Sequence, residues 1–163
     1  MVEVSTALTF AFSIIGTFVF IVLKFFIGKI FKGWKGMETV FNEGIRVMGK
    51  EDVWYVLGAY AGEDRERTDA LITKIIKKCE KKRTKWKVIY NESARDTFQY
   101  EQQSPITENR FLAQETPATI NIYKDVTFIA LWIKRPLAFR VKNQKVADSF
   151  KKYFEFMWNM AKP

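Results

Sequence analysis

The sequence predicts an α/β (α+β) fold, in which helices flank a central sheet, behind an N-terminal transmembrane helix. Three observations lead to this prediction: a charge-free apolar run from Val4 to Leu23, an alternation of short β-rich runs with helical patterns after it, and an amphipathic C-terminal segment. We therefore expect a membrane anchor with its basic flank over residues 1–32 and a separate domain over residues 37–163.

The apolar run has the length of a membrane span, since a helix needs about 20 apolar residues to cross a bilayer. It offers no polar face that would meet water on the surface of a soluble domain. A cleaved signal peptide is less consistent, because the start carries Glu3 and no small-residue cleavage pattern follows the run. The sequence therefore predicts a single span.

Flanking charge predicts the orientation of this span. Lysines follow the run and no lysine or arginine precedes it, so the C-terminal domain should be cytoplasmic and the lipid bilayer should be a partner. Lysine and tryptophan side chains can reach lipid headgroups. The residues expected at the membrane interface are Lys24, Lys29, Lys32, Trp34 and Lys35. A stripe of small residues at Thr9, Ser13, Gly16 and Thr17 would permit close helix approach, which favours a homo-oligomer.

Composition excludes several kinds of chemistry. The chain has 163 residues, 27 Lys+Arg against 18 Asp+Glu, one cysteine (Cys79) and no histidine. Without histidine there is no Ser-His-Asp triad, no Cys-His dyad and no histidine metal ligand. No glycine-rich phosphate loop occurs, and the acidic cluster at residues 63–69 suits a helix start better than a metal site. We expect no catalytic residue, no metal and no cofactor.

The first half of the domain reads as two helix–strand pairs. Helical spacing from Met37 to Met48 predicts a helix that ends at Gly49. Residues 54–60 form a short apolar, β-rich run that predicts a buried strand, and residues 63–83 predict a long helix whose last turns are rich in lysine. Residues 85–91 predict a second strand. A weakly helical segment follows, up to the break at Ser104-Pro105.

The second half predicts four strands and a final helix. Residues 110–114 are the third strand, residues 118–123 and 127–133 form a hairpin, and residues 137–142 follow Pro136 as another strand. Apolar residues then recur at helical spacing, which predicts core packing rather than a cofactor site. They are Val146, Phe150, Tyr153, Phe154, Met157, Trp158 and Ala161.

Polar residues lie at the predicted carboxyl ends of the first two strands, where α/β sheets bind ligands. Tyr60 follows the first strand, and Asn91, Glu92 and Arg95 follow the second. They are the candidate site for a small polar ligand such as a sugar. The same residues also fit a turn and a helix cap, which is the simpler interpretation.

Several strings carry a family resemblance in their order along the chain. They are F-K-G-W-K-G-M-E-T-V-F (31–41), W-Y-V-L-G (54–58), K-K-R-T-K-W-K-V-I-Y-N-E-S-A-R (81–95), T-P-A-T-I-N-I-Y-K-D (116–125) and V-A-D-S-F-K-K-Y-F-E-F-M-W (146–158). Nearly all of residues 31–163 resembles the phospholipase-D-like effector domain of archaeal TrmB-type transcriptional regulators. In this chain a membrane span stands in place of the family's winged helix-turn-helix, so direct DNA binding is not implied.

The resemblance also bears on catalysis. Catalytic phospholipase-D-like proteins carry His-x-Lys-x-x-x-x-Asp; if Asp125 is that aspartate, Ala118 and Ile120 occupy the other two positions. The resemblance therefore implies a membrane-anchored, non-catalytic domain for ligand sensing, ligand binding or protein interaction. Two alternatives stay open: a phosphodiesterase on the same fold, and a soluble transcriptional regulator whose apparent span comes from an early start codon.

Overall fold

The computed structural model describes residues 28–113 and 115–163. The predicted span from Val4 to Leu23 lies outside these residues. Within the described ranges, none of the helices combines the length and the apolar character that crossing a bilayer requires. The span therefore stays a prediction from sequence.

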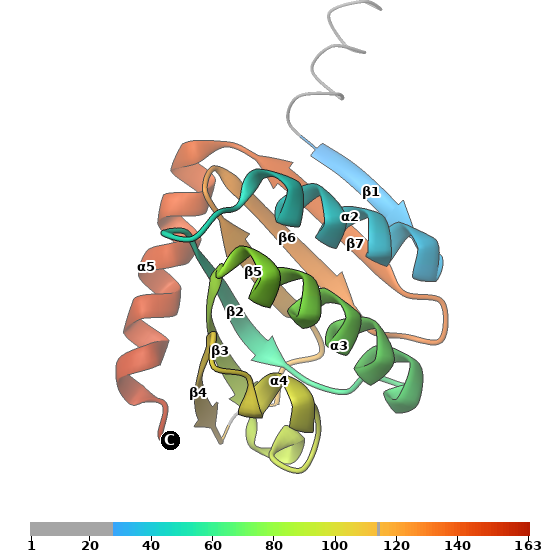
Figure 1. The fold of residues 1–163 in the computed structure, drawn as a ribbon, viewed down its shortest axis with the longest axis vertical. Coiled ribbons are helices and arrows are strands. Elements are labelled where there is room, and N and C mark those ends of the chain that lie inside the picture. Colours follow the sequence, from blue (N-terminus) through green and yellow to red (C-terminus); the bar gives the residue numbers. More distant parts are fainter. Residues whose placement is uncertain (1–27, 114) are drawn as a thin grey trace, which may run out of the picture.

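The described residues form one seven-stranded mixed sheet with the order β1-β7-β6-β5-β2-β3-β4 (Figure 1). Strands β2, β3 and β4 are parallel, and every other neighbouring pair is antiparallel. The strands are β1 (Gly28–Lys32), β2 (Val53–Ala59), β3 (Lys85–Asn91), β4 (Thr107–Leu112), β5 (Thr119–Tyr123), β6 (Val126–Leu131) and β7 (Leu137–Lys142).

Helices cover both faces of the sheet (Figure 1). One face carries α2 (Gly33–Val47), α3 (Arg65–Lys82), the single-turn η1 (Glu92–Ala94) and α4 (Gln99–Gln103); the other carries α5 (Gln144–Met160). The core under α2 and α3 is built on Trp54, whose ring stacks on Trp86 at 4.8 Å between centroids and lies 4.6 Å from that of Tyr123. Phe154 and Trp158 anchor α5 to its face. The predicted mixed α/β fold is confirmed.

Two of the long helices begin at the caps that their sequences supply. The side chain of Asp64 accepts a hydrogen bond from the backbone N–H of Arg67 at 3.1 Å, which starts α3. Asn143 accepts from the N–H of Val146 at 3.2 Å and starts α5 in the same way. Helix α3 ends at Arg83, whose φ of 57° is left-handed.

The start of the domain differs from the prediction. The sequence grouped residues 28–32 with the flank of the anchor, but they form the edge strand β1, which pairs with β7. Phe31 is only 5% exposed because it points into the core below α2. The sheet thus begins at Gly28, and the first helix at Gly33 rather than Met37.

The other elements lie at the residue ranges predicted from the sequence or differ from them by a few residues. The hairpin of β5 and β6 is confirmed, whereas the third strand lies at 107–112 rather than 110–114. The prediction that Tyr153 packs in the core is wrong, since its side chain is 65% exposed. Among the described residues α5 is the one helix on this face, so only its innermost stripe, Ala147, Phe154, Trp158 and Ala161, is buried against the sheet.

Candidate functional site

The three residues that the resemblance would align with the catalytic motif, Ala118, Ile120 and Asp125, lie on and beside β5. Ile120 pairs with Leu57 and Ile129 across the sheet and packs in the apolar cluster under α5. The carbonyl oxygen of Ala118, just before the strand, lies 3.3 Å from the hydroxyl of Thr116. Asp125 lies in the turn at the other end of β5, with its carboxylate 3.8 Å from the Lys142 ammonium group. If Asp125 is the aspartate of the family pattern, the methyl group of Ala118 and the sec-butyl group of Ile120 occupy the positions of its nucleophile and its cation.

Strand alternation sends the polar residues of β5 to the opposite face. Thr119 and Asn121 are buried under α2 and α3, on the face that does not carry Ile120. The Thr119 hydroxyl donates to the carbonyl oxygen of Gly58 at 3.1 Å, and the Asn121 side-chain oxygen accepts from the Trp54 indole N–H at 3.1 Å. The polar side chains of Thr119 and Asn121 therefore both lie on the face of β5 that α2 and α3 cover.

A small cavity lies next to these two residues. Its empty volume is about 300 Å³ including its open mouth, but only about 20 Å³ can take the centre of a water-sized molecule. That space suits one water or a group of similar size. Aromatic and aliphatic side chains form most of the wall, together with polar groups. The lining residues are Phe41, Val56, Ala59, Tyr60, Ile72, Trp86, Phe98, Glu101, Thr119, Asn121 and Trp132.

Among the described residues of this wall, Glu101 is the only acidic one. It is 4% exposed, and no ion pair with it occurs among the described residues. Burial, with a smaller contribution from Asp69, raises the pKa of Glu101 to about 8, although the nearby Tyr90 hydroxyl opposes the shift. At neutral pH the carboxyl is therefore mainly protonated and can donate a hydrogen bond.

Two further donors in the wall lack an oxygen or nitrogen partner among the described residues. The side-chain amide nitrogen of Asn121 is buried without a hydrogen bond, and the buried indole N–H of Trp86 has only the weakly accepting sulfur of Cys79 beside it. Leaving a buried donor unpaired costs about 1–3 kcal/mol. A bound molecule with acceptor oxygens would remove this cost.

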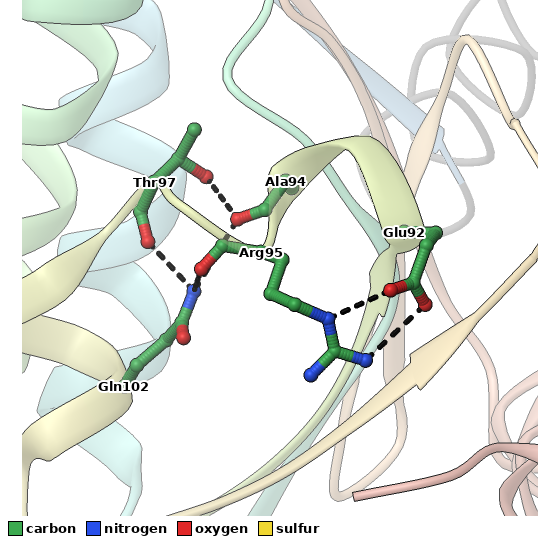
Figure 2. A network of polar contacts seen from close by, with 5 residues as sticks. All are labelled: Glu92, Ala94, Arg95, Thr97 and Gln102. Atoms are coloured by element: carbon green, nitrogen blue, oxygen red, sulfur yellow. Dashed lines mark hydrogen bonds and ion pairs between the residues drawn. The ribbon is translucent and has the colours of Figure 1, made fainter.

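A clamp of hydrogen bonds from the Gln102 side chain ties α4 to the loop before it (Figure 2). Glu101 precedes Gln102 in the same helix and is positioned with it. The side-chain amide of Gln102 donates to the carbonyl oxygens of Ala94 at 3.3 Å, Arg95 at 3.2 Å and Thr97 at 2.6 Å. The Thr97 hydroxyl also donates to the Ala94 carbonyl at 2.6 Å. The loop between β3 and α4 is thereby tied to α4, and Glu101 of this helix lines the cavity.

The predicted ligand residues Tyr60 and Asn91 both hold the segment before β5. The Tyr60 hydroxyl donates to the carbonyl oxygen of Pro117 at 2.7 Å and accepts from the N–H of Trp132 at 3.2 Å. The Asn91 amide donates to the carbonyl oxygen of Thr116 at 3.1 Å. Tyr60 lines the cavity, whereas Asn91 acts on the adjacent backbone.

The other two predicted ligand residues do not line this cavity. Glu92 and Arg95 form an exposed ion pair at 2.7 Å, visible in Figure 2, and the Arg95 guanidinium stacks over Phe111 at 3.9 Å. Asn91 gives η1 no side-chain cap, so the helix-cap interpretation is wrong for that side chain. Sequence reasoning missed Glu101, Trp86 and Asn121. One signal for these residues is present in the sequence: the polar Asn121 lies within the β-rich run T-I-N-I-Y, where a buried strand would otherwise be apolar.

The predicted membrane-interface residues are distributed along β1 and α2. Lys24 lies outside the described residues, and Lys29 lies beside Gly28 at the start of β1. Lys32 is the last residue of β1, and Lys35 lies in the first turn of α2. Trp34 packs against the core, where the Arg67 guanidinium stacks on its ring at 4.7 Å.

Comparison of the fold with solved structures gives clear matches. TrmBL2, an archaeal chromatin protein, matches with a TM-score of 0.55 and 12% identity over 98% of this chain and 67% of its own. NucT from Helicobacter pylori matches with a TM-score of 0.61 and 15% identity over 82% of this chain and 96% of its own. Phosphatidylserine synthase from Haemophilus influenzae Rd KW20 matches with a TM-score of 0.56 and 12% identity, over 78% of this chain and 36% of its own. The chain has a phospholipase-D-like fold.

The predicted resemblance is thus confirmed for the fold of the domain, which is also TrmB-like. No protein-family profile matches the chain, and no curated protein does. At 12–15% identity these matches establish the architecture alone.

Proposed function

We propose that the protein is a membrane-anchored, non-catalytic phospholipase-D-like domain that senses a small polar ligand. The observation that carries this proposal is that the two faces of β5 differ, with Ile120 on an apolar face and Thr119 and Asn121 on a polar one. Ile120, which the resemblance would align with the catalytic lysine, packs in an apolar cluster. The polar residues of β5 face a cavity whose wall contains unpaired donors.

The non-catalytic part of the proposal rests on the chemistry of phosphodiester cleavage. In the resembling catalytic proteins a histidine attacks phosphorus and a lysine stabilises the charge. This chain has no histidine, and an alkyl side chain at position 120 can neither attack nor stabilise an oxyanion.

The cavity wall defines the class of ligand. At neutral pH the carboxyl of Glu101, the amide of Asn121 and the indole of Trp86 present hydrogen-bond donors between aromatic walls. Such a set suits the hydroxyl or carbonyl oxygen of a small uncharged molecule. A molecule larger than a few atoms needs the segment held by Tyr60 and Asn91 to move outward.

Thermal unfolding of the detergent-solubilised full chain tests ligand binding. We expect small sugars or polyols to raise Tm in the native chain and in Glu92→Gln, whose exposed carboxylate lies away from the cavity. Glu101→Gln keeps the shape of the side chain but changes its hydrogen bonding, and should weaken the shift about tenfold in ligand concentration. Equal shifts in all three forms would contradict this site.

Hydrolysis of a phosphodiester tests the enzyme alternative. We expect the purified full chain to release no more product than the Asp125→Asn variant. Turnover that disappears in this variant would overturn the non-catalytic proposal.

Membrane fractionation tests the anchor. We expect the full chain to stay in membranes through an alkaline carbonate wash, because the apolar run from Val4 to Leu23 is long enough to span. Recovery of the chain in the soluble extract would favour the soluble-regulator alternative.

A second candidate function, protein interaction, is favoured by the outer surface of α5. Tyr153 and Phe156 are each 65% exposed, and Met160 is 56% exposed. Aromatic and methionine side chains are enriched at protein interfaces. If this surface serves the predicted homo-oligomer, Tyr153→Ser with Phe156→Ser should reduce chemical cross-linking of the solubilised chain without lowering Tm.

A further inference from the structure

The strand pairing places five charged chain segments at one end of the sheet, beside the uncharged start of β4, where Thr107 pairs with Trp86. Gly28 pairs with Val141, and Val126 pairs with both Lys142 and Tyr123, so these residues lie together. Val53, the start of β2, pairs with Lys85, the start of β3. The segments 28–29, 46–53, 81–85, 123–126 and 141–145 form this end, which we call the basic end.

The segments of the basic end carry an excess of basic over acidic residues. Only three acidic residues lie in its segments: Glu51, Asp52 and Asp125. Ten basic residues lie there: Lys29, Arg46, Lys50, Lys81, Lys82, Arg83, Lys85, Lys124, Lys142 and Lys145. All ten are exposed, so the excess charge faces outward.

Side-chain contacts join these segments into one surface. The Lys124 ammonium lies 3.1 Å from the Asp52 carboxylate, and that of Lys142 lies 3.8 Å from Asp125. The Lys82 ammonium donates to the carbonyl oxygen of Ile45 at the end of α2. These contacts engage Asp52 and Asp125, and the Lys29 ammonium lies 3.4 Å from Glu43 of α2. In the part of the chain that the structure describes, the basic residues of this end without an ion-pair partner are Arg46, Lys50, Lys81, Lys82, Arg83, Lys85 and Lys145.

The opposite end of the sheet has balanced charge. It consists of segments 31–35, 58–66, 90–98, 113–119 without residue 114, and 131–137, which meet through pairs such as Lys32 with Leu137 and Ala59 with Tyr90. These segments carry six basic and six acidic residues. The net charge of the domain is therefore concentrated at one end along the strand direction.

We propose that the basic end lies against an anionic phospholipid surface and fixes the orientation of the domain there. The proposal rests on the proposed anchor, since only residues 24–27 separate the apolar run from Gly28, which belongs to the basic end. A leaflet rich in anionic lipid attracts basic groups within a Debye length, about 8 Å at physiological salt. A lipid surface suits this end better than nucleic acid because the charge surrounds the point where the chain leads to its apolar run.

This surface differs from the one that the sequence favoured. Lys32 lies at the far end of β1, about 13 Å from Gly28 at 3.3 Å per residue. Lys35 follows it in α2, at the charge-balanced end. The lipid-facing lysines thus come from α3, from the β5–β6 turn and from the start of α5, which are remote in sequence.

Energy transfer in nanodiscs tests the orientation of the full chain. A donor dye is attached through Gln144→Cys at the basic end or Asn159→Cys near the other end of α5, with an acceptor on the lipid headgroups. The native Cys79 is buried, and burial raises the pKa of its thiol to about 11, so it does not compete for the label. With about 30 mol% anionic lipid, transfer from position 144 should exceed that from position 159 at least twofold.

Charge reversal supplies the matched variants. Lys81→Glu, Lys85→Glu and Lys145→Glu together should abolish the difference between the two labels. Lys35→Glu, Lys134→Glu and Arg135→Glu change the charge equally at the other end and should preserve it. If both triple variants behave like the native chain while the protein stays in the bilayer, the orientation proposal is wrong and the anchor stands.

Two other results overturn the proposal in distinguishable ways. Loss of all forms from the nanodiscs would refute the anchor, and the orientation with it. Tight binding of a short duplex DNA that only the basic-end triple variant loses, with unchanged energy transfer to lipid, would assign this surface to nucleic acid instead.

Discussion

The hydroxyl of Tyr60 donates a hydrogen bond to the carbonyl oxygen of Pro117 at 2.7 Å, joining the end of β2 to the segment that leads into β5. Because the same hydroxyl accepts from the N–H of Trp132, one side chain ties three parts of the cavity rim. Burial raises the pKa of this phenol, so it stays a donor throughout the physiological range.

Tyr60→Phe should lower the free energy of unfolding by about 1–2 kcal/mol, because it leaves the Pro117 carbonyl and the Trp132 N–H without their partner. Denaturant titration of the full chain measures the loss. Tyr153→Phe is the matched control, since its side chain is 65% exposed, and should change stability by less than about 0.5 kcal/mol. Equal effects would show that the rim contact is not stabilising.

Glu101→Gln should stabilise the protein increasingly as pH rises. The folded carboxyl has a pKa of about 8 against an ordinary value of 4.5, so folding binds a proton between these pH values. The contribution of Glu101 is fully present below about pH 4.5 and is lost as pH rises to about 8. At pH 7 the variant should gain about 2 kcal/mol, at 1.36 kcal/mol per pKa unit and with partial relaxation.

Unfolding free energies at pH 5, 7 and 9 check this dependence on Glu101. Glu92→Gln is the control, because its exposed carboxylate has a pKa lowered by the hydrogen bond from Arg95 and shows no such loss at high pH. Parallel pH profiles for the native chain and Glu101→Gln would show that the carboxyl ionises freely.

Gly62→Ala should destabilise the protein much more than Gly33→Ala. Both glycines have positive φ, 70° and 69°, so an alanine at either position costs about 1 kcal/mol in backbone strain. At Gly62 a Cβ would also lie 2.4 Å from the carbonyl oxygen of Trp132, whereas nothing lies within 4 Å at Gly33. We expect a total loss above about 3 kcal/mol for Gly62→Ala, measured by thermal unfolding. Similar Tm values for Gly62→Ala and Gly33→Ala would contradict the close approach of Trp132 to Gly62.

Phe31→Ala should cost about 3 kcal/mol or more, although the sequence placed this residue in the flank of the anchor. Its ring is 5% exposed in the core, whereas the neighbouring Ile30 side chain is 56% exposed on the other face of β1. Ile30→Ala is therefore the matched control and should cost less than about 1 kcal/mol. If the two variants unfold alike, β1 is not a structural part of the sheet.

Local pattern predicted most of the elements. The helices near residues 63–83 and 146–161 and the strands near 54–60, 85–91 and 137–142 are present within a few residues, because hydrophobic periodicity and caps such as Asp64 and Asn143 are local signals. Strand β1 was missed, since its apolar residues continue the run that precedes it. Its pairing with β7, in which Ile30 lies opposite Phe139, identifies it as a strand.

The candidate site was predicted only in part. Tyr60 was found because it follows a buried strand, but Glu101 belongs to the polar string Q-Y-E-Q-Q, which has no sign of burial. Its position depends on the Gln102 clamp and on the packing of α4, which are contacts between segments. The unpaired Trp86 indole and Asn121 amide were equally invisible, since hydrogen-bond satisfaction is a property of three-dimensional neighbours.

The sequence by itself determined the fold class, the apolar run and the missing histidine, because length, periodicity and composition act locally or by count. The tertiary structure decided which face of β5 each residue meets, that Phe31 belongs to the core, and that ten basic side chains gather at the end where Gly28 lies. Strand pairing brings together residues that are far apart in the chain. The pattern of residues along the chain does not by itself show which distant strands pair or which of their residues lie opposite each other.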